Sequence, residues 1–445
     1  MHNLAIALHE KGHRITGSDD EIFEPSRSRL KEQGLFPEIV GWDPGRIHAG
    51  LDLVILGMNA RKNNPELKKA RELGLKIQSF PEYLYEHSKN KKRVVIGGSH
   101  GKTTITAMVM HVFRDQGMDF DYMVGSQVEG FDTMVRLTED APFIILEGDE
   151  YLSSAIDPRP KFHLYNPHMV LLSGIAWDHM NVFRTFETYK QQFRRFLRIA
   201  TGGGKVFYYD GDPVLGEVVD RSHWSLLKIP YEEHPFAVES GRFVLKTKYG
   251  SVPLRLIGRH NMQNIQGAML ICRDLGVEDH QFYDSIQTFK GADRMQQLLA
   301  NGHERAVYLD FAHAPSKVRA TVNAFRETYP EKNLVTCLEL HTYSSLNREY
   351  IPQYRGALND ADRAIVYYNP SNVKKKRLPS LSPGEVREYF GMENLEVYNE
   401  AEQLEAALKC MRENTCILLL MTSGDFSGLD IRALAKEWVA AADFS

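Results

Sequence analysis

The sequence of 445 residues has only four cysteines, and none of them lies in a Cys-x-x-Cys or Cys/His pattern. Neither a disulfide framework nor a zinc site is therefore expected, and this cysteine usage favours a reducing compartment. No apolar run approaches the roughly 20 residues that cross a bilayer, and the N-terminus lacks the basic and apolar regions of a signal peptide. These absences predict a cytoplasmic protein without membrane insertion.

The sequence also lacks a surplus of positive charge. Lys and Arg number 54 against 58 Asp and Glu, which gives a net charge of −4. Because proteins that bind nucleic acids usually carry a basic surplus, nucleic-acid binding is not expected. Apolar residues make up 43% and charged residues 25%, as in ordinary globular proteins. At roughly 150 residues per domain, the length suggests about three domains.

Short apolar runs that predict β-strands alternate with helical patterns along the chain. Near-continuous apolar strands separated by helices predict an α/β fold with parallel sheets covered on both faces. Since ligands bind beyond the carboxyl ends of such strands, the residues directly after each run are candidates for a site. The runs are residues 52–56, 93–96, 143–146, 169–172, 306–309, 334–338, 364–368 and 416–420.

Two boundaries are expected, at the Lys-rich stretch 87–93 and near residues 290–294, where a new strand series begins. Between them, residues 202–253 predict short strands and turns. The start of the chain is unusual, because residues 2–8 predict a helix with no strand before it. Residues 13–16 then predict a strand that leads into Gly17-Ser18-Asp19, so a first strand and its Gly-rich turn are missing from the expected pattern.

The strongest motif is a Gly-rich turn between a predicted strand and a predicted helix, Gly97-Gly98-Ser99-His100-Gly101-Lys102-Thr103-Thr104. Backbone N–H groups of such a turn, together with the helix N-terminus, bind phosphate oxygens. Lys102 is expected to reach the β- and γ-phosphates of a nucleotide, and Thr103 to ligate Mg²⁺. Ile96 stands where the general phosphate-loop pattern has Gly, and a chance Gly-Lys-Thr turn is the alternative.

Carboxylates and a histidine follow the next strands. Glu147-Gly148-Asp149-Glu150 comes directly after residues 143–146, where a further Mg²⁺ ligand is expected beside a phosphate loop. Asp178-His179 follows the strand at 169–172 in the same way. A solvated acidic turn and a structural histidine are the respective alternatives.

Weaker candidates lie in the second half of the chain. His260 and Asn264 share a helix face and present polar groups either to an adenine or only to a helix cap. Lys290 and Arg294 are candidate phosphate ligands or an ordinary surface pair. The strand at 306–309 ends in Asp310-Phe311-Ala312-His313. These residues either contact a nucleotide when a third domain closes over it or form an ordinary strand-to-helix turn. The basic run 374–377 is an anion contact or a solvated loop.

Together, these motifs resemble the Mur ligase family, the ATP-dependent amide-forming enzymes of bacterial peptidoglycan. Residues 97–104 are similar to the family's own phosphate loop, which accounts for Ile96. In family order, residues 147–150 resemble its E-A-D-E motif, 178–179 its D-H pair, 260–264 its H-N-x-x-N motif and 310–315 its D-x-A-H-x-P motif. The resemblance covers essentially the whole chain.

The resemblance implies an α/β protein of three domains. These are a Rossmann-like UDP-sugar-binding domain (1–90), a central P-loop ATPase domain (91–290) and a Rossmann-like acceptor and nucleotide-closing domain (291–445). It implies an ADP-forming ligase that uses ATP and Mg²⁺, with Lys102, Glu147, His179 and Arg294 in catalysis. The metal ligands are expected to be Thr103, Glu147 and His179. The other implied binding residues are Gly98, Ser99, His100, Gly101, Thr104, His260, Asn264, Asp310 and His313 for ATP, and Ser18, Asp19, Asn64 and Glu66 for the UDP-sugar. Read locally, Asn64-Pro65-Glu66 instead predicts the N-cap and acidic first turn of a helix.

Within the family, the chain resembles the branch that acts on UDP-N-acetylmuramate. Residues 150–151, 157–162 and 421–428 are similar to members that attach L-Ala-γ-D-Glu-meso-diaminopimelate through an acyl phosphate in peptidoglycan recycling. The alternative acceptor is free L-alanine, as in peptidoglycan biosynthesis. More distant alternatives are an acceptor-independent P-loop NTPase, a nucleotide-sugar-binding module and a folylpolyglutamate-type ligase. A monomer or weak dimer is expected. The family's Gly-rich N-terminal turn is not found here, and Ala314 replaces a histidine that is common in this branch.

Overall fold

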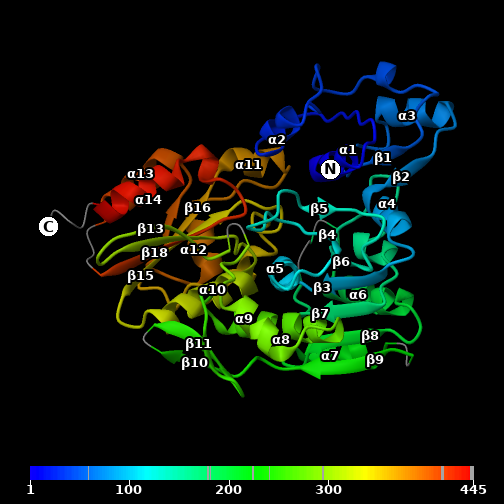
Figure 1. Ribbon diagram of the computed structural model, residues 1–445. Coiled ribbons are helices and arrows are strands. Elements are labelled where there is room, and N and C mark those ends of the chain that lie inside the picture. Colours follow the sequence, from blue (N-terminus) through cyan, green and yellow to red (C-terminus); the bar gives the residue numbers. More distant parts are fainter. Residues whose placement is uncertain are drawn as a thin grey trace. The chain divides into compact units, whose positions relative to one another are not determined.

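A computed structural model describes residues 1–58, 60–177, 180, 182–222, 225–239, 241–292, 295–411 and 415–440 (Figure 1). The chain forms two compact units, each assembled from three segments. Unit 1 comprises Met1–Ile175, Phe186–Glu232 and Gly267–Asp279, and unit 2 comprises Ala176–Thr185, Glu233–Gln266 and His280–Ser445. Because the segments alternate, the chain passes from one unit to the other five times.

Unit 1 contains a seven-stranded sheet in which all neighbouring strands are parallel except β4 and β5. Apart from the exposed Lys92 at the start of β3, the central strands β3, β6 and β7 are buried at every position, as expected for a sheet covered on both faces. Helix α5 contacts β3 and β6, and helix α7 contacts β8. In sheet order, the strands are β5 (Val135–Arg136), β4 (Asp121–Met123), β6 (Phe143–Glu147), β3 (Lys92–Gly97), β7 (Met169–Leu172), β8 (Lys205–Tyr209) and β9 (Leu227–Tyr231); the helices are α5 (Lys102–Asp115), η2 (Lys161–Leu164), α6 (Phe186–Ile199) and α7 (Pro213–Asp220).

The N-terminal part of unit 1 has a much smaller sheet, formed by two parallel strands. Its core is the cluster of Leu56, Ala60 and Leu67, against which Trp42 and Ile77 pack. Residues 13–16 are not a strand, so that prediction is wrong; in the described part of the chain no strand pairs with them. The elements are α1 (His2–Glu10), α2 (Ser26–Glu32), η1 (Pro44–Arg46), β1 (Val54–Leu56), α3 (Pro65–Glu72), β2 (Ile77–Ser79) and α4 (Phe80–His87).

Unit 2 contains a six-stranded sheet that is parallel except for the antiparallel edge strand β13. A separate antiparallel sheet of three strands lies earlier in the chain. In sheet order, the large sheet has β13 (Gln297–Asn301), β14 (Ala306–Asp310), β18 (Cys416–Met421), β15 (Asn333–Leu340), β16 (Arg363–Tyr368) and β17 (Glu396–Tyr398), and the small sheet has β10 (Phe236–Glu239), β11 (Arg242–Thr247) and β12 (Gly250–Pro253).

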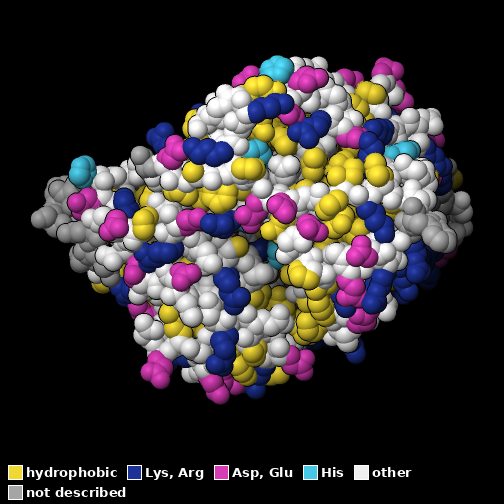
Figure 2. Space-filling model, turned by 90° about the horizontal axis from the view of Figure 1, so that it is seen from below, with side chains coloured by type: hydrophobic (Ala, Val, Ile, Leu, Met, Phe, Trp, Pro, Cys, Tyr) yellow, Lys and Arg dark blue, Asp and Glu magenta, His cyan; other side chains and the backbone are white. Residues whose placement is uncertain are grey.

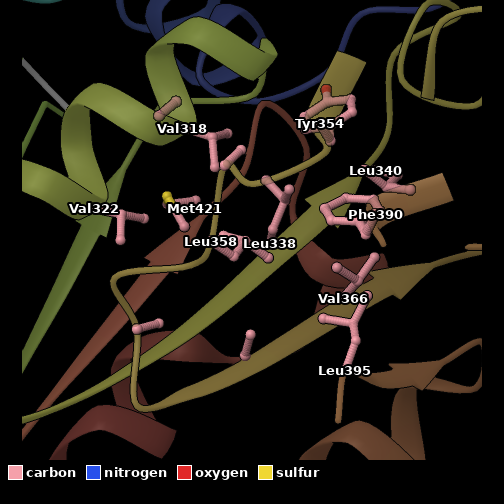
Figure 3. Packing of buried hydrophobic residues seen from close by; sticks show 14 of the residues in the cluster. Val318, Val322, Leu338, Leu340, Tyr354, Leu358, Val366, Phe390, Leu395 and Met421 are labelled. Carbon is pink, nitrogen blue, oxygen red and sulfur yellow. The ribbon is translucent and has the colours of Figure 1, made fainter. Parts of the chain in front are cut away.

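Helices cover both faces of the six-stranded sheet, with one buried hydrophobic cluster under each layer. Figure 3 shows one of these clusters, in which Val318 and Val322 of α10 point toward Leu338 and Met421 of the sheet. Helices α13 and α14 pack over the second cluster, through Leu404 among others. The helical elements that lie wholly in unit 2 are α10 (Pro315–Thr328), η3 (Ile351–Tyr354), α11 (Pro370–Lys375), α12 (Pro383–Phe390), α13 (Ala401–Lys409), η4 (Phe426–Gly428) and α14 (Ile431–Ala440), whereas α8 (Arg259–Asp274) and α9 (Asp279–Ile286) contain residues of both units.

The α/β fold predicted from the strand pattern is confirmed, and a strand is present at each of the eight predicted runs. The prediction for residues 202–253 is only partly right. β8 and β9 extend the parallel sheet of unit 1 with α7 between them, and only β10–β12 form a separate β region. None of the described helices is long and apolar enough to cross a membrane. Basic and acidic side chains are interspersed on the face in Figure 2, as expected from the small net charge.

Candidate active site

The phosphate-loop candidate lies in unit 1 between β3 and α5. The backbone turns at Gly98 and Gly101, whose φ angles are +125° and +72°. A Cβ atom on Gly98 would lie 2.4 Å from Ser173 Oγ, so only glycine fits at this position. Ser99 N donates a hydrogen bond to Gly174 O at 2.9 Å, which holds the loop against the end of β7. The loop therefore delivers the uncapped N-terminus of α5 to the carboxyl edge of the sheet, as an anion site requires.

Lys102 lies at the centre of this loop. Its Nζ donates to Gly98 O and to Glu150 Oε2, both at 2.7 Å. Burial would lower the pKa of Lys102, but the carboxylates of Glu150, Asp149 and Glu147 outweigh burial and raise the pKa above its usual value. The ammonium group therefore stays charged and can take a phosphate oxygen in place of one of its present partners.

A candidate magnesium site lies beside Lys102. Thr103 Oγ1 donates to Glu147 Oε1 at 2.9 Å, and Gly125 N donates to Glu147 Oε2 at 2.7 Å. Burial raises the pKa of Glu147, against the opposing effect of Lys102. The described residues contain no group of three or more His, Cys, Asp or Glu that could hold a metal ion alone. A hydroxyl beside one carboxylate nevertheless fits Mg²⁺, which usually takes its other ligands from phosphates and water.

The remaining loop residues also have defined places. His100 O accepts a hydrogen bond from Ser173 Oγ, and Thr104 is buried in the first turn of α5. The predicted catalytic residues His179 and Arg294 lie outside the described residues, as does Asp178.

A second cluster lies in unit 2, where α8 begins. Gln296 Nε2 lies 3.4 Å from His260 Nε2, and Gln296 N donates to Asp310 Oδ2 at 2.9 Å. Burial lowers the pKa of His260 to about 4, so its ring is neutral at pH 7. Burial raises the pKa of Asp310, although backbone N–H groups of Gln296 and Ala312 oppose the shift. Gln296 therefore connects two residues that the sequence motifs had placed separately.

The other predicted residues of this cluster are held by local hydrogen bonds. Asn264 Nδ2 donates to Asn261 Oδ1 at 3.2 Å, and Asn261 Nδ2 donates to Ile257 O at 2.8 Å. His313 Nδ1 lies 2.8 Å from Phe311 O. The sequence reasoning missed Gln296 and Asn261. Asn261 could have been found from its place within the H-N-x-x-N motif, whereas Gln296 lies in no motif.

In the N-terminal part, the structure brings Ser18 and Glu66 together. Ser18 Oγ donates to Glu66 Oε1 at 2.7 Å, and Arg46 Nη1 donates to Ser18 Oγ at 2.9 Å. Asn64 has a structural task, because its Oδ1 accepts from Leu67 N at 3.0 Å and caps α3. Asp19 lies one residue from Ser18, and its Oδ1 accepts from the next backbone N–H. Arg46 is a further polar candidate that no motif indicated.

A third polar cluster lies at the carboxyl ends of β15 and β18. Glu339 is 1% exposed, and its Oε2 accepts from Thr422 Oγ1 and, at 3.0 Å, from Phe426 N. Its other oxygen lies 3.5 Å from His341 Nδ1. Burial favours a raised pKa for Glu339, but the nearby His341 and the hydrogen bonds from Thr422 and Phe426 N outweigh it and lower the pKa. The sequence reasoning did not single out this carboxylate, although Glu339 directly follows the predicted strand at 334–338; in the structure β15 extends beyond it to Leu340.

Three family models match successive parts of the chain: "Mur ligase family, catalytic domain" at residues 1–92, "Mur ligase middle domain" at 96–272 and "Mur ligase, glutamate ligase domain" at 293–424. The UDP-N-acetylmuramate–L-alanyl-γ-D-glutamyl-meso-2,6-diaminoheptandioate ligase of Haemophilus influenzae is 28% identical, over 98% of this chain and 96% of that protein. The UDP-N-acetylmuramate–L-alanine ligase of Limosilactobacillus reuteri is also 28% identical, over 82% of each.

Two solved structures share the fold over almost the whole chain. A murein peptide ligase from Psychrobacter arcticus superposes with a TM-score of 0.68 at 19% identity, covering 98% of this chain and 96% of that one. A UDP-N-acetylmuramate–alanine ligase from Thermotoga maritima gives a TM-score of 0.72 at 19% identity, covering 99% and 96%. The three-domain α/β architecture expected from the motifs is thereby confirmed.

Proposed function

Because this chain belongs to the Mur ligase family, we propose that it joins UDP-N-acetylmuramate to L-Ala-γ-D-Glu-meso-diaminopimelate in an ATP-dependent, ADP-forming reaction. The observation that carries the proposal is the phosphate loop. There, the ammonium group of Lys102 and the contact of 2.9 Å between Thr103 Oγ1 and Glu147 Oε1 lie at one sheet edge. The tripeptide acceptor is supported by the relative that acts on it, which aligns over 98% of this chain.

The chemistry requires two anions to meet. The lactyl carboxylate of the sugar attacks the γ-phosphorus of ATP, which gives an acyl phosphate and ADP. The amine of the acceptor then attacks the acyl carbon, and inorganic phosphate leaves as the amide forms. Since the first step brings a carboxylate to a phosphate, the charge of Lys102 is the main contribution of the described residues. Mg²⁺, when held by Thr103 and Glu147, would neutralise further phosphate charge.

Other residues complete the proposal. His179 is a further metal ligand, and Arg294 and His313 contact the nucleotide when the protein closes over it. His260 and Asn264 bind the adenine and Asp310 the ribose, while Ser18, Asp19, Asn64 and Glu66 contact the UDP-sugar. Because Oδ1 of Asn64 caps α3, its contact to the sugar is proposed to be made by Nδ2.

We place the acceptor at the carboxyl ends of β15 and β18. Ligands of parallel α/β sheets bind beyond the carboxyl ends of the strands, and Glu339, His341 and Thr422 converge there. Lys376 lies after α11 in the same unit, and the pKa of Lys376 is lowered by burial and by Lys375, with Glu339 opposing. A carboxylate, an imidazole and a partly buried ammonium group suit an acceptor that carries both ammonium and carboxylate groups.

The deciding experiment is phosphate release from ATP with Mg²⁺ and UDP-N-acetylmuramate, with the tripeptide, free L-alanine or no acceptor added. Release that depends on the tripeptide supports the proposal, and release that depends on L-alanine alone moves the protein to the alternative reaction. Equal release without an acceptor would indicate an NTPase. Lys102→Met serves as the inactive control. No release with either acceptor, from protein shown to be folded, contradicts the ligase proposal.

A further inference from the structure

A buried tyrosine connects α6 to the phosphate loop. Tyr189 is 0% exposed, and its hydroxyl lies 2.9 Å from Ser99 Oγ and 3.0 Å from Glu150 Oε1. Ser99 belongs to the loop itself, whereas Glu150 follows β6. One hydroxyl therefore contacts two segments that surround the nucleotide-binding turn, from a helix that no sequence motif marked.

Glu150 connects Tyr189 to Lys102. The carboxylate is 1% exposed, and it accepts from Tyr189 on Oε1 and from Lys102 Nζ on Oε2, the latter at 2.7 Å. The carboxylate is an acceptor only, so the single proton of the Tyr189 hydroxyl is donated to it. Ser99 must then donate its own proton to the tyrosine oxygen. The hydrogen bonds thus run in one direction, from Ser99 through Tyr189 to Glu150.

Packing alone does not account for a tyrosine here. The ring packs edge-on against Phe193, with 5.2 Å between ring centroids, and a phenylalanine would make the same contact. Burying a hydroxyl is unfavourable unless it forms hydrogen bonds, and the Tyr189 hydroxyl bonds to both Ser99 and Glu150. Both of these bonds lead to the nucleotide site.

We propose that Tyr189 is a positioning residue for ATP. Its hydroxyl fixes the rotamer of Glu150, Glu150 holds Lys102 toward the loop, and Ser99 anchors the loop backbone, so that the turn has its phosphate-binding shape before ATP arrives. Without the hydroxyl, ATP binding would have to order the loop and the lysine, and that cost reduces affinity. This inference rests on the proposed binding of ATP at the loop.

The test compares Tyr189→Phe with Tyr165→Phe. Tyr165 is also 0% exposed and lies in the same unit, but its hydroxyl has no hydrogen-bond partner in the described part of the chain. Both variants lose one buried hydroxyl, and only one of them loses the connection to the loop. The readouts are MgATP affinity by calorimetry and the KM values for ATP and UDP-N-acetylmuramate.

Tyr189→Phe is expected to weaken MgATP binding and raise the KM for ATP by about five- to tenfold, the effect of losing the net contribution of one hydrogen bond. Its KM for the sugar and its kcat should stay within about twofold, whereas Tyr165→Phe should leave every constant near the wild-type value. A purely structural role would instead reduce the active fraction, and hence kcat, without changing the KM for ATP. Equal ATP constants in the two variants would overturn the inference.

The outcomes separate this inference from the proposed function. If the wild-type protein does not bind MgATP, the proposed function fails; if it binds and Tyr189→Phe binds equally well, only the inference fails. Should Tyr189→Phe not fold, Ser99→Ala removes one of the same hydrogen bonds and leaves the tyrosine ring in place. It is expected to raise the KM for ATP selectively, and an unchanged KM would overturn the inference.

Discussion

Replacing Gly98 by alanine should destabilise the phosphate loop, although the change adds only one methyl group. The φ angle of +125° is one that residues with a Cβ rarely adopt, at a cost of about 1–3 kcal/mol. The new Cβ would also lie 2.4 Å from Ser173 Oγ and 2.9 Å from Ser173 N. Rotating the serine side chain relieves the first overlap but not the second, because the second involves backbone. We therefore expect a total destabilisation of about 3 kcal/mol.

The loop can escape this overlap only by moving away from β7. That movement breaks the hydrogen bond of 2.9 Å from Ser99 N to Gly174 O and shifts the carbonyl of Gly98 that Lys102 contacts. At about 2–4 °C per kcal/mol for a unit of this size, the melting temperature should fall by about 6–12 °C. The stabilisation that MgATP gives the wild-type protein should be largely lost in this variant.

The assay is thermal unfolding with and without MgATP, with Gly216→Ala as the control. Gly216 lies inside α7, where an added Cβ would meet nothing within 4 Å. Alanine there should stabilise the protein by about 0.5–1 kcal/mol, because glycine is a poor helix former. If Gly98→Ala melts within 2 °C or so of the wild type and keeps its response to MgATP, the close approach to β7 described above is wrong.

Four further predictions follow from the described contacts. Lys102→Met should reduce phosphate release by about 100-fold or more and lower the melting temperature, since Glu150 loses its buried partner; near-normal turnover would contradict this. Glu339→Gln should raise the KM for the tripeptide about tenfold and leave the KM for ATP unchanged, because it removes the charge facing His341. A change in the KM for ATP alone would argue against the acceptor site. Asn64→Ala should cost about 1 kcal/mol in denaturant unfolding through loss of the α3 cap, and no measurable loss would refute the cap. The pKa of His260 is about 4 in the folded state, against about 6.5 in the unfolded chain. The unfolded state therefore takes up a proton first, and the protein loses stability as the pH falls from about 6.5 toward 4. In His260→Gln, the midpoint of unfolding should therefore change less with pH over that range. If the midpoint of the variant changes with pH as much as that of the wild type, His260 does not contribute.

Local pattern predicted the elements of the fold well where the signal was a buried parallel strand. The run at 143–146 is apolar throughout, and β6 is buried at every position, so the local sequence pattern matches the environment of the strand in the fold. The meeting of Thr103 and Glu147 also followed from sequence, because carboxyl ends of neighbouring parallel strands share an edge. Residues 13–16 failed as a strand because a strand depends on a partner, which a single-sequence pattern does not contain.

The supporting residues could not be predicted for a different reason. Tyr189 has the spacing of an ordinary buried position in an amphipathic helix, and only the folded structure brings its hydroxyl to Ser99 and Glu150. Gln296 and Glu339 are similar cases, since each contributes through contacts with residues distant in sequence. Motifs therefore located the groups proposed to bind ATP and Mg²⁺, whereas the positioning residue Tyr189 and the proposed acceptor contact Glu339 became visible only through tertiary contacts.

The alternation of segments between the two units affects how the protein can be taken apart. Unit 1 is completed by Gly267–Asp279, and unit 2 already begins at Ala176, so no single cut in the chain releases either unit whole. Helix α8 starts in one unit and ends in the other. Expression of residues 91–290 alone would separate β10–β12 from the rest of unit 2, and limited proteolysis is expected to yield nicked species that stay associated rather than free domains. Split-protein reporters and domain grafts on this scaffold should accordingly be designed around the spatial units and not around contiguous stretches of sequence.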